Sequence, residues 1–174
     1  MTMQTFIALL RGVNVGGTGI LPMKDLVALC TDLGFAGTRT WIQSGNAIFQ
    51  SRLSEESVRK KLEAALVAKM GKKIDVMVRT PAELRAILDE NPFPDREPAK
   101  VAVAFLAGAA PKEALRNLVT PGNEEVRAGK REIYVFYPDG MGRSRLKLPL
   151  GGASTTVRNI NTVRKLSELA ETVL

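Results

Sequence analysis

Apolar and polar positions along the first third of the chain predict a strand, a loop and a helix. Residues 4–10 form a continuous apolar run, which is typical of a buried strand. A glycine-rich loop follows at residues 12–19. A helix is predicted to begin at Pro22 and to end at Gly34, because the apolar positions between them share one face. Cys30 lies on that face, so we expect a packed thiol without a catalytic role.

The pattern then predicts two strands, a helix and a further strand, at residues 39–43, 46–50, 55–70 and 74–79. Ser44 and Gly45 between the first two strands suggest a tight hairpin. The element order of this half is βαββαβ, which is the ferredoxin-like order. In such a half we expect the hairpin at the opposite end of the sheet from the glycine-rich loop, so that the two do not share a site.

The second half predicts a similar but shorter order. A linking helix begins at Pro81, and the proline-rich residues 91–99 form the predicted boundary. Beyond it the pattern predicts βαββα, with strands and helices at residues 100–106, 112–119, 124–127, 132–137 and a last helix ending near 173. The expected fold class is α+β, with two ferredoxin-like α/β sandwich halves of which the second is incomplete. The predicted parts are residues 1–90, the linker 91–99 and residues 100–174.

Composition narrows the chemistry. The chain has 174 residues, no histidine and a single cysteine, Cys30. It therefore lacks the usual general base, the Ser-His and Cys-His pairs, the commonest zinc ligand and any intrachain disulfide. No metal site is predicted, and no cofactor is indicated. The apolar run at residues 6–10 is too short for a signal peptide or a membrane span, so we expect a cytoplasmic protein without a membrane partner.

The net charge of +7 is concentrated near the C-terminus. Residues 126–165 contain nine basic and two acidic residues, and the rest of the chain is neutral. A basic face favours anionic partners such as phosphate esters, nucleotides or nucleic acid. A solvated surface that keeps the protein soluble is an equal alternative.

The glycine-rich loop is one candidate anion site. Its backbone N–H groups, together with Arg11, Asn14, Gly16 and Gly17, would hold a phosphate or carboxylate at the start of the helix. The spacing matches neither a Walker A loop nor a dinucleotide fingerprint. The alternative, which we favour, is a loop that needs glycine for positive φ angles, with Arg11 paired to a nearby acid.

Two basic stretches near the C-terminus form the other candidate. With Thr155 as cap of the last helix, free N–H groups and an arginine would make an anion site, to which the preceding loop adds charge. The predicted ligand-binding residues of this region are Arg143, Ser144, Arg145, Thr155, Thr156, Arg158 and Asn159. Helix capping together with an arginine that ties the two halves together explains the same residues equally well.

Three stretches carry a resemblance to a known family: residues 8–17 (ALLRGVNVGG), 40–46 (TWIQSGN) and 155–162 (TTVRNINT). In this order they resemble the bacterial domain-of-unknown-function family 1697. The resemblance implies an α+β fold of ferredoxin-like halves. It implies no reaction, because none defines the family.

The leading hypothesis is a binding module for a phosphate-bearing ligand, a nucleotide or nucleic acid. The alternatives are a small histidine-free enzyme acting on an anionic metabolite and a protein-interaction domain without a small ligand. An enzyme is expected to place a carboxylate such as Asp139 or Asp32 beside the arginine and glycine groups. An interaction domain is expected to have scattered charges and loops filled by the chain itself.

Overall fold

A computed structural model describes residues 2–15 and 19–172 of the chain. Contacts divide the chain into two compact units. The first contains the residues up to Leu84 together with those from Lys165 onward, and the second contains residues 85–164. Each unit is built on a four-stranded antiparallel sheet, and the described residues also form five α-helices. The predicted mixed α+β class is therefore confirmed.

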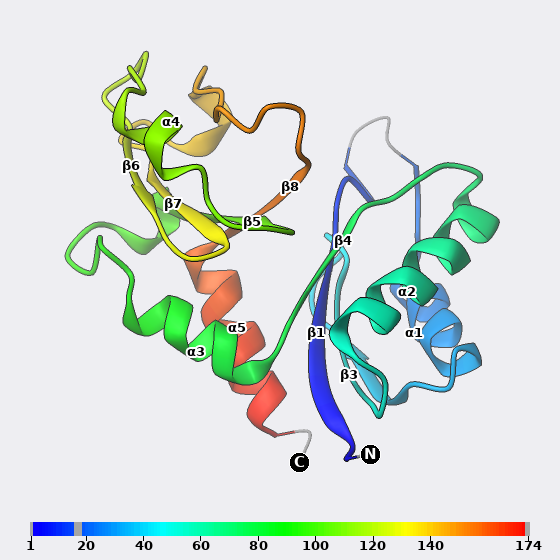
Figure 1. The fold of residues 1–174 in the computed structure, drawn as a ribbon. Helices are drawn as coiled ribbons and strands as arrows, with labels where there is room; N and C mark the ends of the chain where they lie inside the picture. The colour runs from blue at the N-terminus through cyan, green and yellow to red at the C-terminus, as the bar shows by residue number, and fades with distance from the viewer. Residues whose placement is uncertain (1, 16–18, 173–174) are drawn as a thin grey trace. The chain divides into compact units, whose positions relative to one another are not determined.

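The first unit follows the predicted order βαββαβ (Figure 1). Its elements are β1 (Gln4–Leu10), α1 (Met23–Asp32), β2 (Ala36–Thr40), β3 (Asn46–Ser51), α2 (Glu55–Met70) and β4 (Val76–Arg79). The strand order across the sheet is β2-β3-β1-β4. The central strand β1 pairs antiparallel with both β3 and β4.

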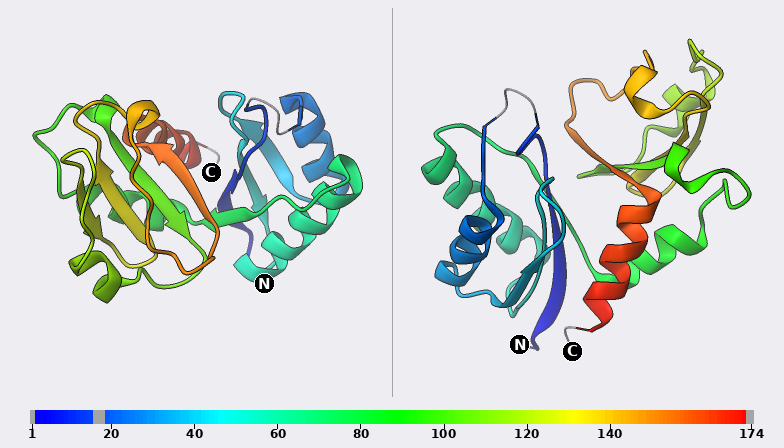
Figure 2. Two further views of the ribbon diagram at one scale, coloured as in Figure 1. Left: turned by 90° about the horizontal axis from the view of Figure 1, so that it is seen from above. Right: turned by 180° about the vertical axis from the view of Figure 1, so that it is seen from behind.

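Helices α1 and α2 cover one face of this sheet (Figure 2). Their buried positions are Leu26 and Cys30 in α1 and Val58, Leu62 and Leu66 in α2. They pack with alternate strand residues such as Phe6 and Phe49, because side chains of the same face recur at every second position of a strand. The predicted burial of Cys30 is confirmed, and burial raises the pKa of its thiol to about 12.

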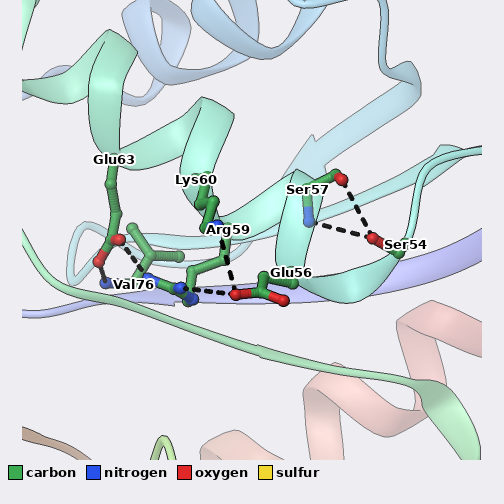
Figure 3. Close-up of polar contacts among 7 residues, drawn as sticks. All are labelled: Ser54, Glu56, Ser57, Arg59, Lys60, Glu63 and Val76. Atoms are coloured by element: carbon green, nitrogen blue, oxygen red, sulfur yellow. Dashed lines mark hydrogen bonds and ion pairs between the residues drawn. The ribbon is translucent and has the colours of Figure 1, made fainter.

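Polar contacts fix α2 at its start and along its exposed side (Figure 3). The Ser54 hydroxyl oxygen accepts a hydrogen bond from the Ser57 N–H at 3.2 Å, which caps the helix as predicted. The Glu63 carboxylate pairs with Arg59 at 2.6 Å and also accepts from the N–H of Val76, the first residue of β4, at 3.2 Å. One carboxylate therefore ties the helix to the edge strand.

The second unit repeats the strand order of the first with a different set of covering elements (Figure 1). Helix α3 (Pro81–Asp89) leads into it from the first unit. Its further elements are β5 (Val101–Leu106), α4 (Lys112–Arg116), β6 (Glu125–Ala128), β7 (Glu132–Phe136) and β8 (Thr155–Asn159). Helix α5 (Ile160–Glu171) begins in this unit and continues into the residues of the first. The strand order is β6-β7-β5-β8, so β5 takes the place of β1 and β8 that of β4.

The prediction that the second half lacks its fourth strand is wrong. Residues 155–159 form β8, which pairs with β5 from Ala102 opposite Asn159 to Leu106 opposite Thr155. What the second unit lacks is the helix between its third and fourth strands. Residues 137–154 contain Pro138, Pro149 and four glycines, which disfavour a helix, and only a short 3₁₀ turn forms at Met141–Arg143.

An extended segment covers the second sheet where the first has α2. Leu146, Leu148 and Leu150 pack against a core that includes Ala104, Ile133 and Val135. Their spacing of two residues is the period of an extended chain, and it differs from the spacing of four of Val58, Leu62 and Leu66 in α2. This segment leads directly into β8.

The hairpin between β2 and β3 lies elsewhere than predicted. Its connection spans residues 41–45 and is longer than a two-residue turn. Because β1 and β3 are antiparallel, the start of β3 lies beside the end of β1, and the Leu10 N–H donates to the Gly45 carbonyl at 2.9 Å. The hairpin and the glycine-rich loop are therefore at the same end of the sheet, and the prediction of opposite ends is wrong.

Candidate functional site

Three connections meet at the end of β1 and form what we call the loop end of the first unit. They are the loop after β1, the hairpin at residues 41–45, and the turn before β4, whose Asp75 carbonyl accepts from the Arg11 N–H at 3.0 Å. Figure 2 shows this end away from the labelled N-terminus. The described part of one stretch that carries the family resemblance, residues 8–15, thus lies beside a second stretch, residues 40–46.

The Asn14 side chain joins two of these connections. Its amide donates to the Leu21 carbonyl at 2.7 Å and to the Gln43 carbonyl at 2.6 Å, and its oxygen accepts from the Leu21 N–H at 2.7 Å. Asn14 has a φ of +57°, which asparagine tolerates better than most residues. Its carboxamide is engaged with the chain itself.

Arg11 is exposed and has an acidic neighbour. Its guanidinium lies 3.8 Å from the Asp75 carboxylate, with 54% of its side chain exposed. The expected pairing of Arg11 with a nearby acid is therefore present, at a distance and exposure that make it weak. Gly16 and Gly17 lie outside the described residues.

The hairpin backbone has a positive φ at two positions, one of them a strained Ile42. Gly45 has a φ of +86°, and a Cβ added there would lie 2.6 Å from Val13 Cγ2, so only glycine fits. Ile42 has a φ of +52°, which is rare for a β-branched residue. Strain of this kind occurs where the surrounding structure holds a residue in place, often at functional sites.

The predicted residues of β8 are strand residues, and Thr155 does not cap the last helix. The Thr155 hydroxyl donates to the Phe105 carbonyl at 3.0 Å. The cap is Asn159, whose side-chain oxygen accepts from the Asn161 N–H at 2.8 Å. The capping prediction is wrong because residues 155–159 pair along their whole length with β5. A helix that began at Thr155 would lose these backbone hydrogen bonds between strands.

Thr156 and Arg158 lie on the strand face opposite to the leucine-covered core. Both are buried, and the Arg158 guanidinium donates to the Val157 carbonyl at 3.1 Å. Burial lowers the pKa of Arg158 to about 10. Asn159 also donates to the Ala99 carbonyl at 2.9 Å.

The remaining predicted residues line a cavity of about 260 Å³ in the second unit. Its wall comes from two stretches of chain, residues 121–124 before β6 and residues 137–145 after β7. The second stretch belongs to the segment that stands in place of the missing helix. The lining residues are Pro121, Gly122, Glu124, Tyr137, Pro138, Asp139, Gly140, Arg143, Ser144 and Arg145.

Glu124 is the buried carboxylate of this cavity. One oxygen accepts from the Ser144 hydroxyl at 2.7 Å and the other from the Gly122 N–H at 2.9 Å. The hydrogen bond from Ser144 is the main cause that lowers the pKa of Glu124. Burial, followed by the nearby Glu124 charge, raises the pKa of Tyr137. The cavity therefore holds an ionised carboxylate beside a neutral phenol.

The two arginines of the cavity are unengaged. Within residues 2–15 and 19–172, no hydrogen bond or ion pair involves the side chain of Arg143 or Arg145, and the same is true of Asp139. All three are exposed. Two guanidinium groups, one free carboxylate and one fixed carboxylate thus face the same space.

Asp32, the other carboxylate considered for an enzyme, lines a separate groove between α1 and α2 with Asp25 and Lys69. In the part of the chain described, no three His, Cys, Asp or Glu residues lie together as metal ligands. No helix formed by the described residues is long and apolar enough to cross a membrane.

A family model described as "Protein of unknown function (DUF1697)" matches residues 3–134. The chain belongs to this family. The match confirms the resemblance carried by its sequence motifs. It covers the loop end of the first unit and the stretch Pro121–Glu124 of the cavity, and it ends before Arg143.

A solved structure with the same fold is described as that of the conserved bacterial protein SP0830 from Streptococcus pneumoniae. It is 24% identical, with a TM-score of 0.79, over 97% of this chain and 99% of that chain. An unknown protein from Galdieria sulphuraria aligns at 10% identity over 99% of this chain and 92% of that chain, with a TM-score of only 0.30. None of the curated proteins matches the chain.

For this member of the DUF1697 family, sequence reasoning found the arginine half of the cavity and missed Glu124 and Tyr137. Glu124 follows a Pro-Gly-Asn turn and precedes a short strand, a place where an acidic residue is ordinarily a solvated surface group. Only the pairing of Ser144 with Glu124, twenty residues apart, reveals its role.

Proposed function

We propose that the protein binds a small phosphate-bearing ligand in the cavity of the second unit. The observation that carries this proposal is the pair of unengaged arginines, Arg143 and Arg145, in the wall of one cavity of about 260 Å³. Guanidinium groups form charge-assisted, often bidentate, hydrogen bonds with phosphate oxygens. The volume is close to the lower end of the range typical of small-molecule sites, roughly 300–1,000 Å³.

The carboxylates of the cavity indicate which phosphate ester fits. Asp139 is free to accept a hydrogen bond, and Glu124 is held in place by Ser144. A phosphate alone would meet two negative charges as well as two positive ones. A ligand with a hydroxylated group beside its phosphate, as in a nucleotide, would use the arginines for the phosphate and Asp139 for a hydroxyl.

Titration of the full chain tests the proposal. The ligands are inorganic phosphate, a nucleoside monophosphate and a short single-stranded RNA, each at low and at moderate salt. Calorimetry on wild type should show that the nucleotide binds more tightly than phosphate. Arg143→Gln and Arg145→Gln should each weaken nucleotide binding about tenfold or more, because a charge-assisted bond contributes roughly 1.5–3 kcal/mol.

The matched control is Arg52→Gln, which removes an exposed arginine from the first unit. It should leave nucleotide affinity unchanged. If RNA binds instead, with steep salt dependence and equal small losses for all three variants, the ligand is nucleic acid held by a diffuse basic face. Flat titrations for every ligand at low salt would refute phosphate binding.

Asp139 supports a second candidate, a small histidine-free enzyme acting on an anionic metabolite. An enzyme was expected to place a carboxylate beside the arginines and the glycine-rich loop; Asp139 lines the same cavity as the two arginines, and that lining includes no described residue of the glycine-rich loop. Asp139 would accept a proton from a bound hydroxyl or water. Asp139→Asn should then abolish turnover of a bound nucleotide while retaining its binding, whereas a pure binder turns nothing over.

The other expectations remain part of this proposal. They are a ferredoxin-like topology that is incomplete in the second unit, a linker at residues 91–99 and a cytoplasmic location. Arg11, Asn14, Gly16, Gly17 and the β8 residues also remain predicted ligand residues. The binding proposed for the cavity does not depend on them.

A further inference from the structure

The loop end of the first unit exposes an unusual share of apolar surface. Among the described residues, seven large apolar side chains are strongly exposed, and three of them belong to this end. Ile20 is 82% exposed, Val15 52% and Ile42 49%. Single exposed apolar residues are ordinary, but several on adjoining loops mark an interaction site.

The Asn14 carboxamide holds the three segments together. Its atoms bond Leu21 and Gln43 at 2.6–2.7 Å. Val15, Ile20 and Ile42 are the direct chain neighbours of Asn14, Leu21 and Gln43. The three exposed residues therefore lie within about two residue lengths of one amide group, on backbone that hydrogen bonds keep in place.

Ile42 is exposed at an energetic cost. A φ of +52° is unfavourable for a β-branched residue, and glycine or asparagine would relieve it. Half of its side chain nevertheless faces solvent, where folding gains little from an isoleucine. Strain kept at an exposed apolar side chain points to a use outside the folding of this chain.

Charge at the loop end indicates what it binds. Arg11 is more than half exposed, and among residues 2–15 and 19–172 its side chain pairs with Asp75 alone, which lies 3.8 Å away and is shared with Lys73 at 3.6 Å. A carboxylate approaching from outside would find the Arg11 guanidinium available for a bidentate contact. The surface thus combines aliphatic side chains with exposed cations, Arg11 and, beside Gly19, Lys72.

We propose that this surface, defined by Arg11, Val15, Ile20 and Ile42, docks a peptide segment of a partner protein that carries apolar side chains and a carboxylate. Asn14, Leu21 and Gln43, the direct neighbours of the three apolar residues, are already held by hydrogen bonds, which lowers the ordering cost of binding such a segment. The site is separate from the cavity of the second unit and does not depend on the ligand proposed there.

Two other occupants fit less well. A lipid surface is attracted by clusters of about four to eight unpaired basic residues, whereas Arg11 and Lys73 share Asp75 and Lys69 pairs with Asp25 at 3.5 Å. A second copy of the chain docking through the same surface would place two Arg11 guanidinium groups in one small interface, to which Val15, Ile20 and Ile42 contribute no carboxylate, and like charges at an interface are unfavourable.

Selection of displayed random peptides against the folded full chain tests the proposal. Selected peptides should be rich in apolar residues and contain Asp or Glu. Ile20→Ser and Ile42→Asn should each weaken their binding about tenfold, the effect of exposing one buried aliphatic side chain. Arg11→Gln should weaken it to a similar extent.

Val119→Ser is the matched control, because Val119 is 87% exposed in the second unit and should not affect binding. Ile42→Asn should unfold at the same or a higher denaturant concentration than wild type, which separates lost docking from lost folding. The proposal is overturned if no peptide is selected, if selected peptides lack carboxylates, or if they bind Ile20→Ser as well as wild type. Association with phosphatidylglycerol vesicles, or dimerisation, that the same variants abolish would also overturn it.

Discussion

The two units arrange four strands in the same order but cover them differently. In the first, α2 buries Val58, Leu62 and Leu66 on the sheet. In the second, an extended segment between β7 and β8 covers the sheet with half-buried leucines two residues apart. A helix satisfies its own backbone hydrogen bonds, whereas an extended segment leaves N–H groups, carbonyls and polar side chains available to a ligand.

The difference places the candidate surfaces at different ends of the two sheets. The cavity of the second unit opens after β7, where the first unit instead begins α2 with the Ser54 cap. At the end of β1 in the first unit, the loops are filled by Asn14 and by the close approach of Gly45 to Val13. The comparison teaches that one topology leaves a cavity lined by arginines where a helix is missing, and exposes apolar side chains where loops are packed.

The largest expected effect is on the free energy of unfolding, when a leucine is truncated in α2 or in the extended segment that covers the second sheet. Leu62→Ala should lower the free energy of unfolding by about 2–5 kcal/mol, because Leu62 is fully buried under α2. Leu148→Ala, in the half-buried extended cover, should lower it by roughly half as much. Urea denaturation followed by circular dichroism measures both. Equal losses would mean that the extended segment packs as tightly as the helix.

A smaller effect on stability compares Asn14, whose side chain is hydrogen-bonded within its loop, with Asn123, whose side chain makes no hydrogen bond to the described residues. Asn14 and Asn123 both have a positive φ, +57° and +63°, but in the described structure the Asn123 side chain makes no hydrogen bond. Asn14→Ala should therefore cost about 2–3 kcal/mol more stability than Asn123→Ala, the contribution of three hydrogen bonds. Thermal unfolding of the two variants compares them at the same backbone strain. A difference near zero would show that the Asn14 carboxamide does not hold the loop end.

The smallest effect is a pH dependence in the second unit. The Ser144 hydrogen bond holds the pKa of Glu124 below its ordinary value of 4.5. A depressed carboxylate pKa contributes stability above the ordinary pKa, and this contribution is lost as pH falls through the lowered value. Ser144→Ala should therefore reduce the loss of stability below pH 4.5, whereas Ser154→Ala, outside the cavity, should not. Urea midpoints measured across this range that fall equally steeply in both variants would contradict the assignment.

The sequence was sufficient for most elements of the first unit because caps and periodicity agree there. Ser54 and Gly71 bound α2 as predicted, and apolar spacing located Cys30 in the core. Strand β8 was missed because Thr155 followed by Arg158 and Asn159 reads equally well as a helix start, and only pairing with β5 decides between them. The strands on either side of the hairpin were nearly correct, but the hairpin was assigned to the wrong end of the sheet. Because β3 runs antiparallel to β1, its start lies beside the end of β1.

Half of the candidate cavity was also accessible from the sequence. The concentration of basic residues between positions 126 and 165 drew attention to Arg143 and Arg145, which lie in a loop after the predicted strand at 132–137. Glu124 and Tyr137 did not, because their roles depend on contacts across the fold: a Ser144 hydroxyl for one and burial for the other. Likewise, the exposure of Ile20 and Ile42 follows from loop conformation, which no apolar pattern predicts.

Hydrogen exchange of the full chain, with and without a nucleoside monophosphate, tests the central claim most directly, that the segment replacing the missing helix forms the ligand site. Without ligand, α2 amides should exchange slowly and amides of residues 138–145 quickly. With ligand, protection should appear at residues 121–124 and 137–145 and leave residues 11–15 and 41–45 unchanged. Protection at the loop end of the first unit alone, or no change anywhere at saturating nucleotide, would contradict the account.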